Sequence, residues 1–80
     1  MVITRLVSTE KALNMMNREN KLVFVVQDTA TKPEIRSALQ TMFNTKVLSI
    51  NTQRTMKGEK RAYVRFETPA IDIATKMGMM

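Results

Sequence analysis

Apolar and polar residues follow two different periods along the chain, and each change of period marks a new element. Residues 21–27, "KLVFVVQ", hold an unbroken apolar run rich in β-branched and aromatic residues, which predicts a strand buried on both faces inside a sheet. In residues 61–66 a period of two places Ala62, Val64 and Phe66 on an apolar side, with Tyr63 and Arg65 on the polar side. In all, strands are predicted at residues 2–7, 21–27, 46–53 and 61–66.

The clearest helical pattern begins at Thr31. Thr31 and Glu34 have the spacing of a capping box, and Pro33 stands in the first turn, where its missing N–H does no harm. Asn44 is suited to end this helix in a left-handed conformation. The apolar stripe expected to face the core, at i, i+3, i+4 and i+7, is Ile35, Ala38, Leu39 and Met42.

Two shorter helices flank this central segment. Ser8 or Thr9 can cap the first, which carries Glu10 in its first turn and ends within residues 17–20. For the last helix, Thr68 is the expected cap and Pro69 the start, with Gly78 as the stop. Its apolar side is expected to be Ala70, Ile73, Ala74 and Met77.

The element order is strand, helix, strand, helix, strand, strand, helix, which predicts an α+β domain. One mostly antiparallel four-stranded sheet with packed helices fits this order, and Gly58 marks a hairpin turn between the last two strands. A chain of 80 residues is long enough for a single domain, here residues 1–80, with residues 78–80 expected to fray. No apolar run approaches the ~20 residues of a membrane span, so we expect no membrane insertion and a cytoplasmic location.

Positive charge is concentrated in one part of the chain. The net charge is +6, and residues 44–66 alone carry six bases and one acid. Such a local excess raises the surface potential and attracts a polyanion. Charge alone leaves RNA, DNA and an anionic membrane surface open, and a solvated strand edge is the plain structural alternative.

The side chains that enzymes commonly use are missing or scattered. The chain has neither His nor Cys, its seven carboxylates form no obvious cluster, and its two glycines make no phosphate-binding loop. We therefore expect no enzyme activity, no cofactor and no metal. The low aromatic content, 5%, argues against a protein that reads single strands mainly by stacking.

The basic hairpin is the best candidate for a binding site, and we expect its side chains to form one cationic surface. Arg54, Arg61 and Arg65 can each take two phosphate oxygens, and Tyr63, on the same strand side as Arg61 and Arg65, can stack on a base or ribose. The remaining hairpin candidates for phosphate or 2′-hydroxyl contacts are Asn51, Thr52, Lys57 and Lys60.

Four segments in order resemble the universal large-ribosomal-subunit protein twenty-three family. They are "STEKA", "NKLVFVV", "ATKPEIRSALQTMFNTKV" and "INTQRTMKGEKRAYVRF", and the likeness covers about residues 7–66. The short loop between the last two strands is similar to the archaeal and eukaryotic form.

The resemblance implies a structural protein at the rim of the polypeptide exit tunnel that binds large-subunit rRNA as a monomer within the ribosome. It also implies a neighbour, ribosomal protein twenty-nine, and a docking platform for signal recognition particle or other nascent-chain factors. Glu10 is implied as a factor contact, while Lys11 and Lys32 are implied as further RNA contacts. Two rival functions stay open: a free-standing nucleic-acid-binding module, and an adaptor for an acidic protein.

Overall fold

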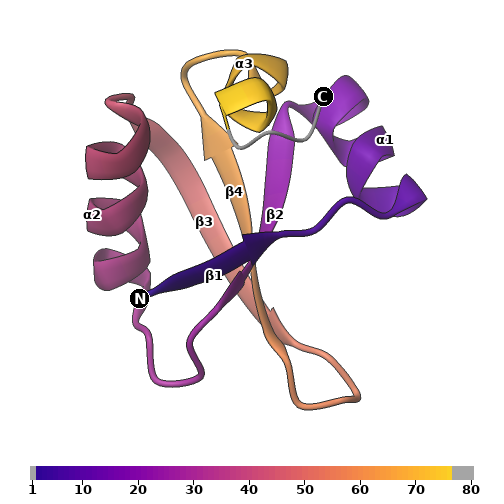
Figure 1. Cartoon of the computed structure of the whole chain (residues 1–80), viewed down its shortest axis with the longest axis vertical. Coiled ribbons are helices and arrows are strands. Elements are labelled where there is room, and N and C mark those ends of the chain that lie inside the picture. The colour runs from indigo at the N-terminus through magenta and orange to yellow at the C-terminus, as the bar shows by residue number, and fades with distance from the viewer. Residues whose placement is uncertain (1, 77–80) are drawn as a thin grey trace.

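The computed structural model describes residues 2–76, and the predicted element order is confirmed. Figure 1 shows the helices arranged around a twisted sheet, with α2 on one side of the strands and α1 on the other. The elements are β1 (Ile3–Leu6), α1 (Glu10–Glu19), β2 (Lys21–Val26), α2 (Lys32–Phe43), β3 (Val47–Arg54), β4 (Lys60–Phe66) and α3 (Ala70–Lys76).

The four strands form one antiparallel sheet in the order β1-β2-β4-β3, which confirms the α+β class. β2 lies inside the sheet, as its continuous apolar run predicts, because it pairs with β1 on one side and β4 on the other. β3 and β4 form the expected hairpin, in which Asn51 lies opposite Tyr63 and Gln53 opposite Arg61. This register decides which hairpin side chains share a face.

The main core lies between the sheet and the helices α2 and α3. Phe24, Phe43 and Phe66 meet there with ring centroids 6.1–6.3 Å apart, two of the three pairs edge to face. Ile35 and Leu39 of α2 are fully buried in the same cluster. The prediction that Met42 faces the core is wrong, because its side chain is exposed and Phe43 takes the inward position at the end of the helix.

A second, smaller cluster lies on the opposite side of the sheet. Ala12 of α1 packs there against Val23 and Val25 of β2, with Val7 from the segment before the helix. Met16 of the same helix reaches the main core instead. Helix α1 therefore covers β2 on this second side and reaches Tyr63 of β4.

The predicted caps of the first two helices are confirmed. Thr9 accepts a hydrogen bond from the backbone N–H of Ala12, and Thr31 and Glu34 form the complete capping box. The Glu34 carboxylate accepts from the backbone N–H and the hydroxyl of Thr31, and these bonds lower the pKa of Glu34. Asn44 ends α2 in the left-handed conformation, with φ of 50°.

The last helix starts differently from the prediction. Thr68 does not cap it, because its hydroxyl bonds to the Thr45 hydroxyl. The backbone N–H of Ala70 instead donates to Oδ1 of Asn20, at 2.6 Å, from the end of α1. Since Asn20 precedes Ala70 by 50 residues, no local pattern identifies this cap. The expected inward Met77, the stop at Gly78 and the fraying of residues 78–80 lie outside the described residues.

Within residues 2–76, no helix is long and apolar enough to cross a membrane.

Candidate nucleic-acid interface

The hairpin between β3 and β4 ends in a tight turn that Gly58 makes possible. Its φ of +84° lies in the left-handed region that other residues rarely adopt. The N–H of Gly58 donates to the carbonyl of Thr55 at 2.9 Å, and the Thr55 N–H donates to the carbonyl of Glu59 at 2.8 Å. Lys57 projects from this turn as an exposed residue.

The strand register divides the predicted site residues between two faces of the sheet. We call the side opposite α2 and α3 the open face; on β3 and β4 it carries Ser49, Asn51, Gln53, Arg61, Tyr63 and Arg65. We call the other side the helix face; there β3 and β4 present Ile50, Thr52, Arg54, Lys60, Ala62 and Val64. The prediction of one cationic surface is therefore wrong, because neighbouring residues of a strand point to opposite sides.

The two bases on the helix face contact their own chain. The guanidinium of Arg54 pairs with Asp28 in the loop after β2 and donates to the carbonyl of Gly58 at 3.3 Å. The amino group of Lys60 donates to the carbonyl of Ala30 at 2.7 Å. These contacts join the turn end of the hairpin to the segment before α2, so these two side chains have partners within the fold.

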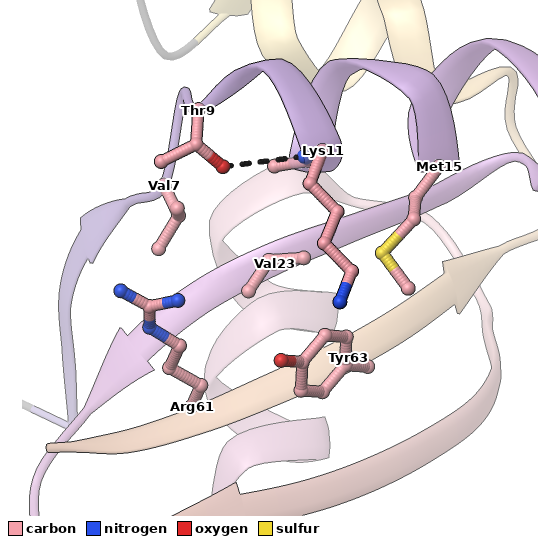
Figure 2. Close-up of a pocket in the computed structure, with 8 residues that line it drawn as sticks. Val7, Thr9, Lys11, Met15, Val23, Arg61 and Tyr63 are labelled. Atoms are coloured by element: carbon pink, nitrogen blue, oxygen red, sulfur yellow. Dashed lines mark hydrogen bonds between the residues drawn. The ribbon is translucent and has the colours of Figure 1, made fainter. Parts of the chain in front are cut away.

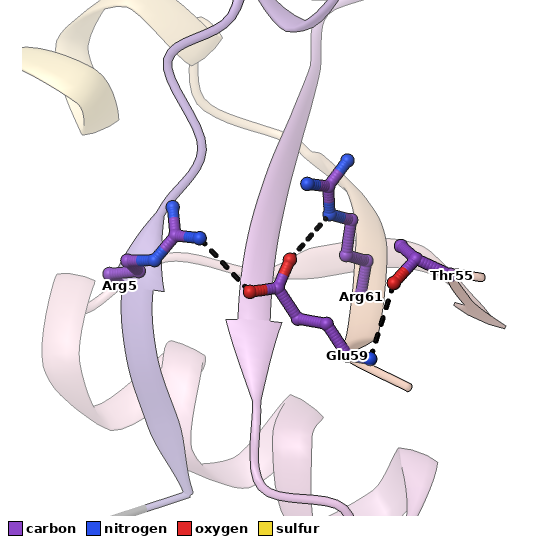
Figure 3. A network of polar contacts seen from close by, with 4 residues as sticks. All are labelled: Arg5, Thr55, Glu59 and Arg61. Atoms are coloured by element: carbon purple, nitrogen blue, oxygen red, sulfur yellow. Dashed lines mark hydrogen bonds and ion pairs between the residues drawn. The ribbon is translucent and has the colours of Figure 1, made fainter. Parts of the chain in front are cut away.

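On the open face, one acid forms ion pairs with two arginines. Glu59 pairs with Arg5 of β1 at 3.0 Å and with Arg61 of β4 at 3.1 Å, as Figure 3 shows. The hydrogen bond from Arg61, with the charge of Arg5, lowers the pKa of the Glu59 carboxyl. The Thr55 hydroxyl accepts a hydrogen bond from the backbone N–H of Glu59 at 3.2 Å and so holds the backbone that carries the Glu59 side chain. Arg5, Arg61 and Glu59 together carry a net charge of +1.

Elsewhere on the open face, two bases have no acidic partner among the described residues. Arg65 of β4 and Lys11 of α1 are both exposed, and neither makes an ion pair within residues 2–76. Figure 2 shows the Lys11 amino group reaching toward the ring of Tyr63, with Met15 beside it. Tyr63 is half-buried, because it borders the small cluster under α1, and one part of its ring remains accessible. Strand and helix thus place cations and an aromatic ring side by side.

The sequence interpretation missed several residues of this face. Ser49 and Gln53 share it with Asn51, and the period-two rule applied to β3 would have selected them in place of Thr52. Lys21 joins them because it lies opposite Arg65 in the pairing of β2 with β4. Its amino group lies 3.5 Å from a carboxylate oxygen of Glu19. Arg5 had no local signal, because its partner Glu59 is 54 residues away.

The two remaining predicted contacts stand apart from the hairpin. Glu10 and Lys32 are the exposed first residues of α1 and α2, and neither forms an ion pair with another described residue. Glu10 in this position also suits the helix dipole. No group of three or more acids that could hold a metal ion occurs within residues 2–76.

Fold and surface together define a small, basic α+β domain with a polar, cationic sheet face. The family model described as "Ribosomal protein L23" matches residues 1–75. The chain is 40% identical over 81 residues to the large ribosomal subunit protein uL23 of Tetrahymena thermophila, covering 99% of this chain and 54% of that protein. It is 41% identical over 81 residues to the protein of the same name from Pyrobaculum aerophilum, covering 99% of this chain and 100% of that protein.

The chain belongs to the ribosomal protein L23 family. It is a structural protein of the large ribosomal subunit, and its location is the cytoplasmic ribosome. It spans about half the length of the Tetrahymena relative and the full length of the Pyrobaculum relative. The family is a structural, non-enzymatic kind.

Proposed function

We propose that this chain acts as one domain that binds large-subunit rRNA through the open face and has no catalytic role of its own. The observation that carries the proposal is the clustering of Lys11, Lys21, Arg61 and Arg65 around Tyr63 on one side of the sheet. Glu59 and Glu19 are the acids that pair with bases there, and each faces at least one base. The face is therefore complementary to a polyanion.

The mechanism is positioning by phosphate contacts. An exposed guanidinium such as that of Arg65 can take two phosphate oxygens in a planar arrangement, while a lysine contributes a point charge. Each neutralised phosphate releases counterions, which makes the affinity fall as salt rises. Asn51 and the neighbouring polar residues of β3 can bond to 2′-hydroxyls, which DNA lacks. Lys32 and Lys57, at the periphery, extend the contact along the RNA backbone.

Within this proposal, Arg54, Lys60 and Thr52 act differently from the open-face residues. Arg54 and Lys60 hold the turn end of the hairpin against the segment that precedes α2. Thr52 lies half-buried on the helix face. They support the RNA site by keeping the hairpin rigid. Arg54 is exposed, so it can also contact a phosphate at the periphery of the site.

A salt titration with matched arginine variants tests which face binds. Binding of an rRNA fragment from the large subunit is compared with binding of mixed-sequence RNA for wild type, Arg65→Gln and Arg54→Gln. Arg65→Gln should make the negative slope of log K against log[salt] shallower by about 0.7–0.9 and weaken binding several-fold, because one phosphate contact is lost. Arg54→Gln, which has the same change of charge on the helix face, should change the slope by less than half as much.

Two results would contradict the proposal. Equal slope changes for the two variants would mean that the open face is not the RNA site. Equal affinity for the rRNA fragment and for mixed-sequence RNA would favour a free-standing nucleic-acid-binding module, and no RNA affinity at all would favour an adaptor for an acidic protein.

We further propose that the chain sits at the rim of the exit tunnel beside ribosomal protein twenty-nine. There, α1 would offer a docking contact for signal recognition particle or other nascent-chain factors. The exposed Glu10 at the start of α1, unpaired among the described residues, supports this role. Glu10→Ala should weaken factor recruitment and leave incorporation into the large subunit intact. Loss of incorporation would show that Glu10 serves the fold or the RNA contact instead.

A further inference from the structure

A groove of about 270 Å³ lies on the open face beside Tyr63, where three strands and one helix meet. It is separate from the small pocket of about 20 Å³ on the Arg61 side of Tyr63, shown in Figure 2, although Lys11, Met15 and Tyr63 border both. The side chains that matter for its chemistry are Lys11, Met15, Lys21, Asn51, Gln53 and Tyr63.

One wall of this groove is apolar. Tyr63 contributes an aromatic ring and Met15 a thioether chain, both half-buried and both packed against the small cluster under α1. This packing holds the ring in place before any ligand arrives. An aromatic ring held in this way is the usual platform on which proteins stack an unpaired base.

The β3 wall of the groove presents two amides. Asn51 and Gln53 are two residues apart on the same strand, so their side chains project in parallel about 7 Å apart. Both residues are exposed, and neither side-chain amide makes a hydrogen bond to another described residue. Each amide offers both a donor and an acceptor, which is what recognition of the polar edge of a base requires.

The charged groups at the groove are cations. Lys11 and Lys21 line it, and no acid is among its lining residues. Arg65 lies opposite Lys21 in the sheet and extends the positive charge beyond the groove. The volume is below the roughly 300–1,000 Å³ of pockets that enclose larger ligands. Size, charge and shape together fit one nucleotide.

We propose that the groove holds a single unpaired nucleotide of the bound RNA. The base stacks on Tyr63 beside Met15, Asn51 and Gln53 bond to its edge, and Lys11 and Lys21 contact the flanking phosphates. This inference rests on the proposed RNA binding and adds a specific site to it. An unpaired nucleotide seated here would let the domain recognise the identity of a base, which phosphate contacts alone do not do.

Mononucleotides provide a direct probe. Isotope-labelled protein is titrated with AMP, CMP, GMP and UMP, each to about 20 mM, because a single stacked base with one phosphate contact binds in the millimolar range. Resonances of the Asn51 and Gln53 side-chain amides and of the Tyr63 ring should shift, and the size of the shifts should depend on the base. Ribose 5-phosphate is the control, since it carries the same phosphate without a base.

Variants separate stacking from hydrogen bonding. Tyr63→Phe keeps the ring and should bind normally, while Tyr63→Leu should weaken binding roughly tenfold. If Tyr63→Leu is not folded, the surface variant N51A/Q53A serves instead, and it should remove the preference among bases. Gln27→Ala removes an exposed amide outside the groove and should have no effect.

The outcomes distinguish this inference from the proposed function. Shifts that are equal for ribose 5-phosphate and all four nucleotides would show an anion site only and overturn it. If the rRNA fragment binds but leaves the groove resonances unchanged, the proposed RNA binding stands and the inference of a nucleotide in the groove is wrong. If neither mononucleotides nor the rRNA fragment bind, both proposals fail.

Discussion

Asn20 offers the sharpest test of how the two ends of the fold are joined. Its side chain accepts a hydrogen bond from the Ala70 N–H at 2.6 Å and donates to the carbonyls of Phe66 at 3.1 Å and Thr68 at 3.4 Å. It thereby ties the end of α1 to the connection between β4 and α3. Its backbone has φ of 56°, so the residue also ends α1 in the left-handed conformation.

Replacement of Asn20 by Gly preserves that backbone conformation and removes the side-chain bonds. Two of the three bonds are 3.1 Å or shorter, and at ~0.5–1.5 kcal/mol each their loss should destabilise the fold by about 1–3 kcal/mol. Asn44→Gly is the matched control, because Asn44 has φ of 50° and no side-chain hydrogen bond to another described residue. In both variants, Gly relieves the strain of the left-handed backbone, which stabilises the fold. Gly also gives the unfolded chain more freedom, which destabilises the fold. Each effect is about 1 kcal/mol, so the two nearly cancel.

Urea denaturation of the three proteins measures this difference. Asn44→Gly should fall within about 1 kcal/mol of wild type, and Asn20→Gly should be less stable than Asn44→Gly by about 1–3 kcal/mol. Asn20→Asp keeps the acceptor for Ala70 but directs a carboxylate oxygen at the carbonyls of Phe66 and Thr68, so it should be no more stable than Asn20→Gly. Equal free energies of unfolding for the two glycine variants would refute the assignment of Asn20 as the link between these elements.

Three further outcomes follow from the core, a cap and an ion pair. Phe24→Ala should lower the free energy of unfolding by about 3–5 kcal/mol, because it opens a cavity between two other phenylalanines; a loss below ~1 kcal/mol in urea denaturation would contradict that packing. Thr31→Ala should cost about 0.5–2 kcal/mol while Thr31→Ser stays near wild type, and equal losses would show that the hydroxyl does not cap α2. Since the folded-state pKa of Glu59 is lowered, its ion pairs stabilise the fold above the ordinary pKa of Glu and cease to do so as pH falls through the lowered value. Wild type should therefore lose more stability than Glu59→Gln across that acidic range, and parallel stability curves would argue against the pairing.

Most of the fold was predictable because its signals are local. The capping box at Thr31, the apolar run of β2 and the alternation in β4 each depend on residues only a few positions apart. The exception within α2 is Met42, since the inward line at the end of the helix runs from Leu39 to Phe43. There a neighbouring aromatic ring on the sheet decides which residue turns inward, and helical period alone does not.

The candidate site was only partly predictable, because side-chain direction and distant partners determine it. Asn51 and Thr52 are adjacent in sequence and lie on opposite faces, so treating the hairpin as one cationic unit joined residues that the sheet separates. The pairing of Arg54 with Asp28 is formed across 26 positions and has no local signature. The predicted grouping of Arg61, Tyr63 and Arg65 on one side is confirmed, because it follows from strand alternation alone.

Protection of single cysteines by RNA tests the central claim most directly. The chain has no cysteine, so Ser49→Cys places one thiol on the exposed open face and Ser37→Cys places one on exposed α2, each by a nearly isosteric change. With large-subunit rRNA bound, modification by a thiol reagent should slow strongly at position 49 and stay unchanged at position 37. Equal protection of both positions, or protection at position 37 alone, would contradict the account.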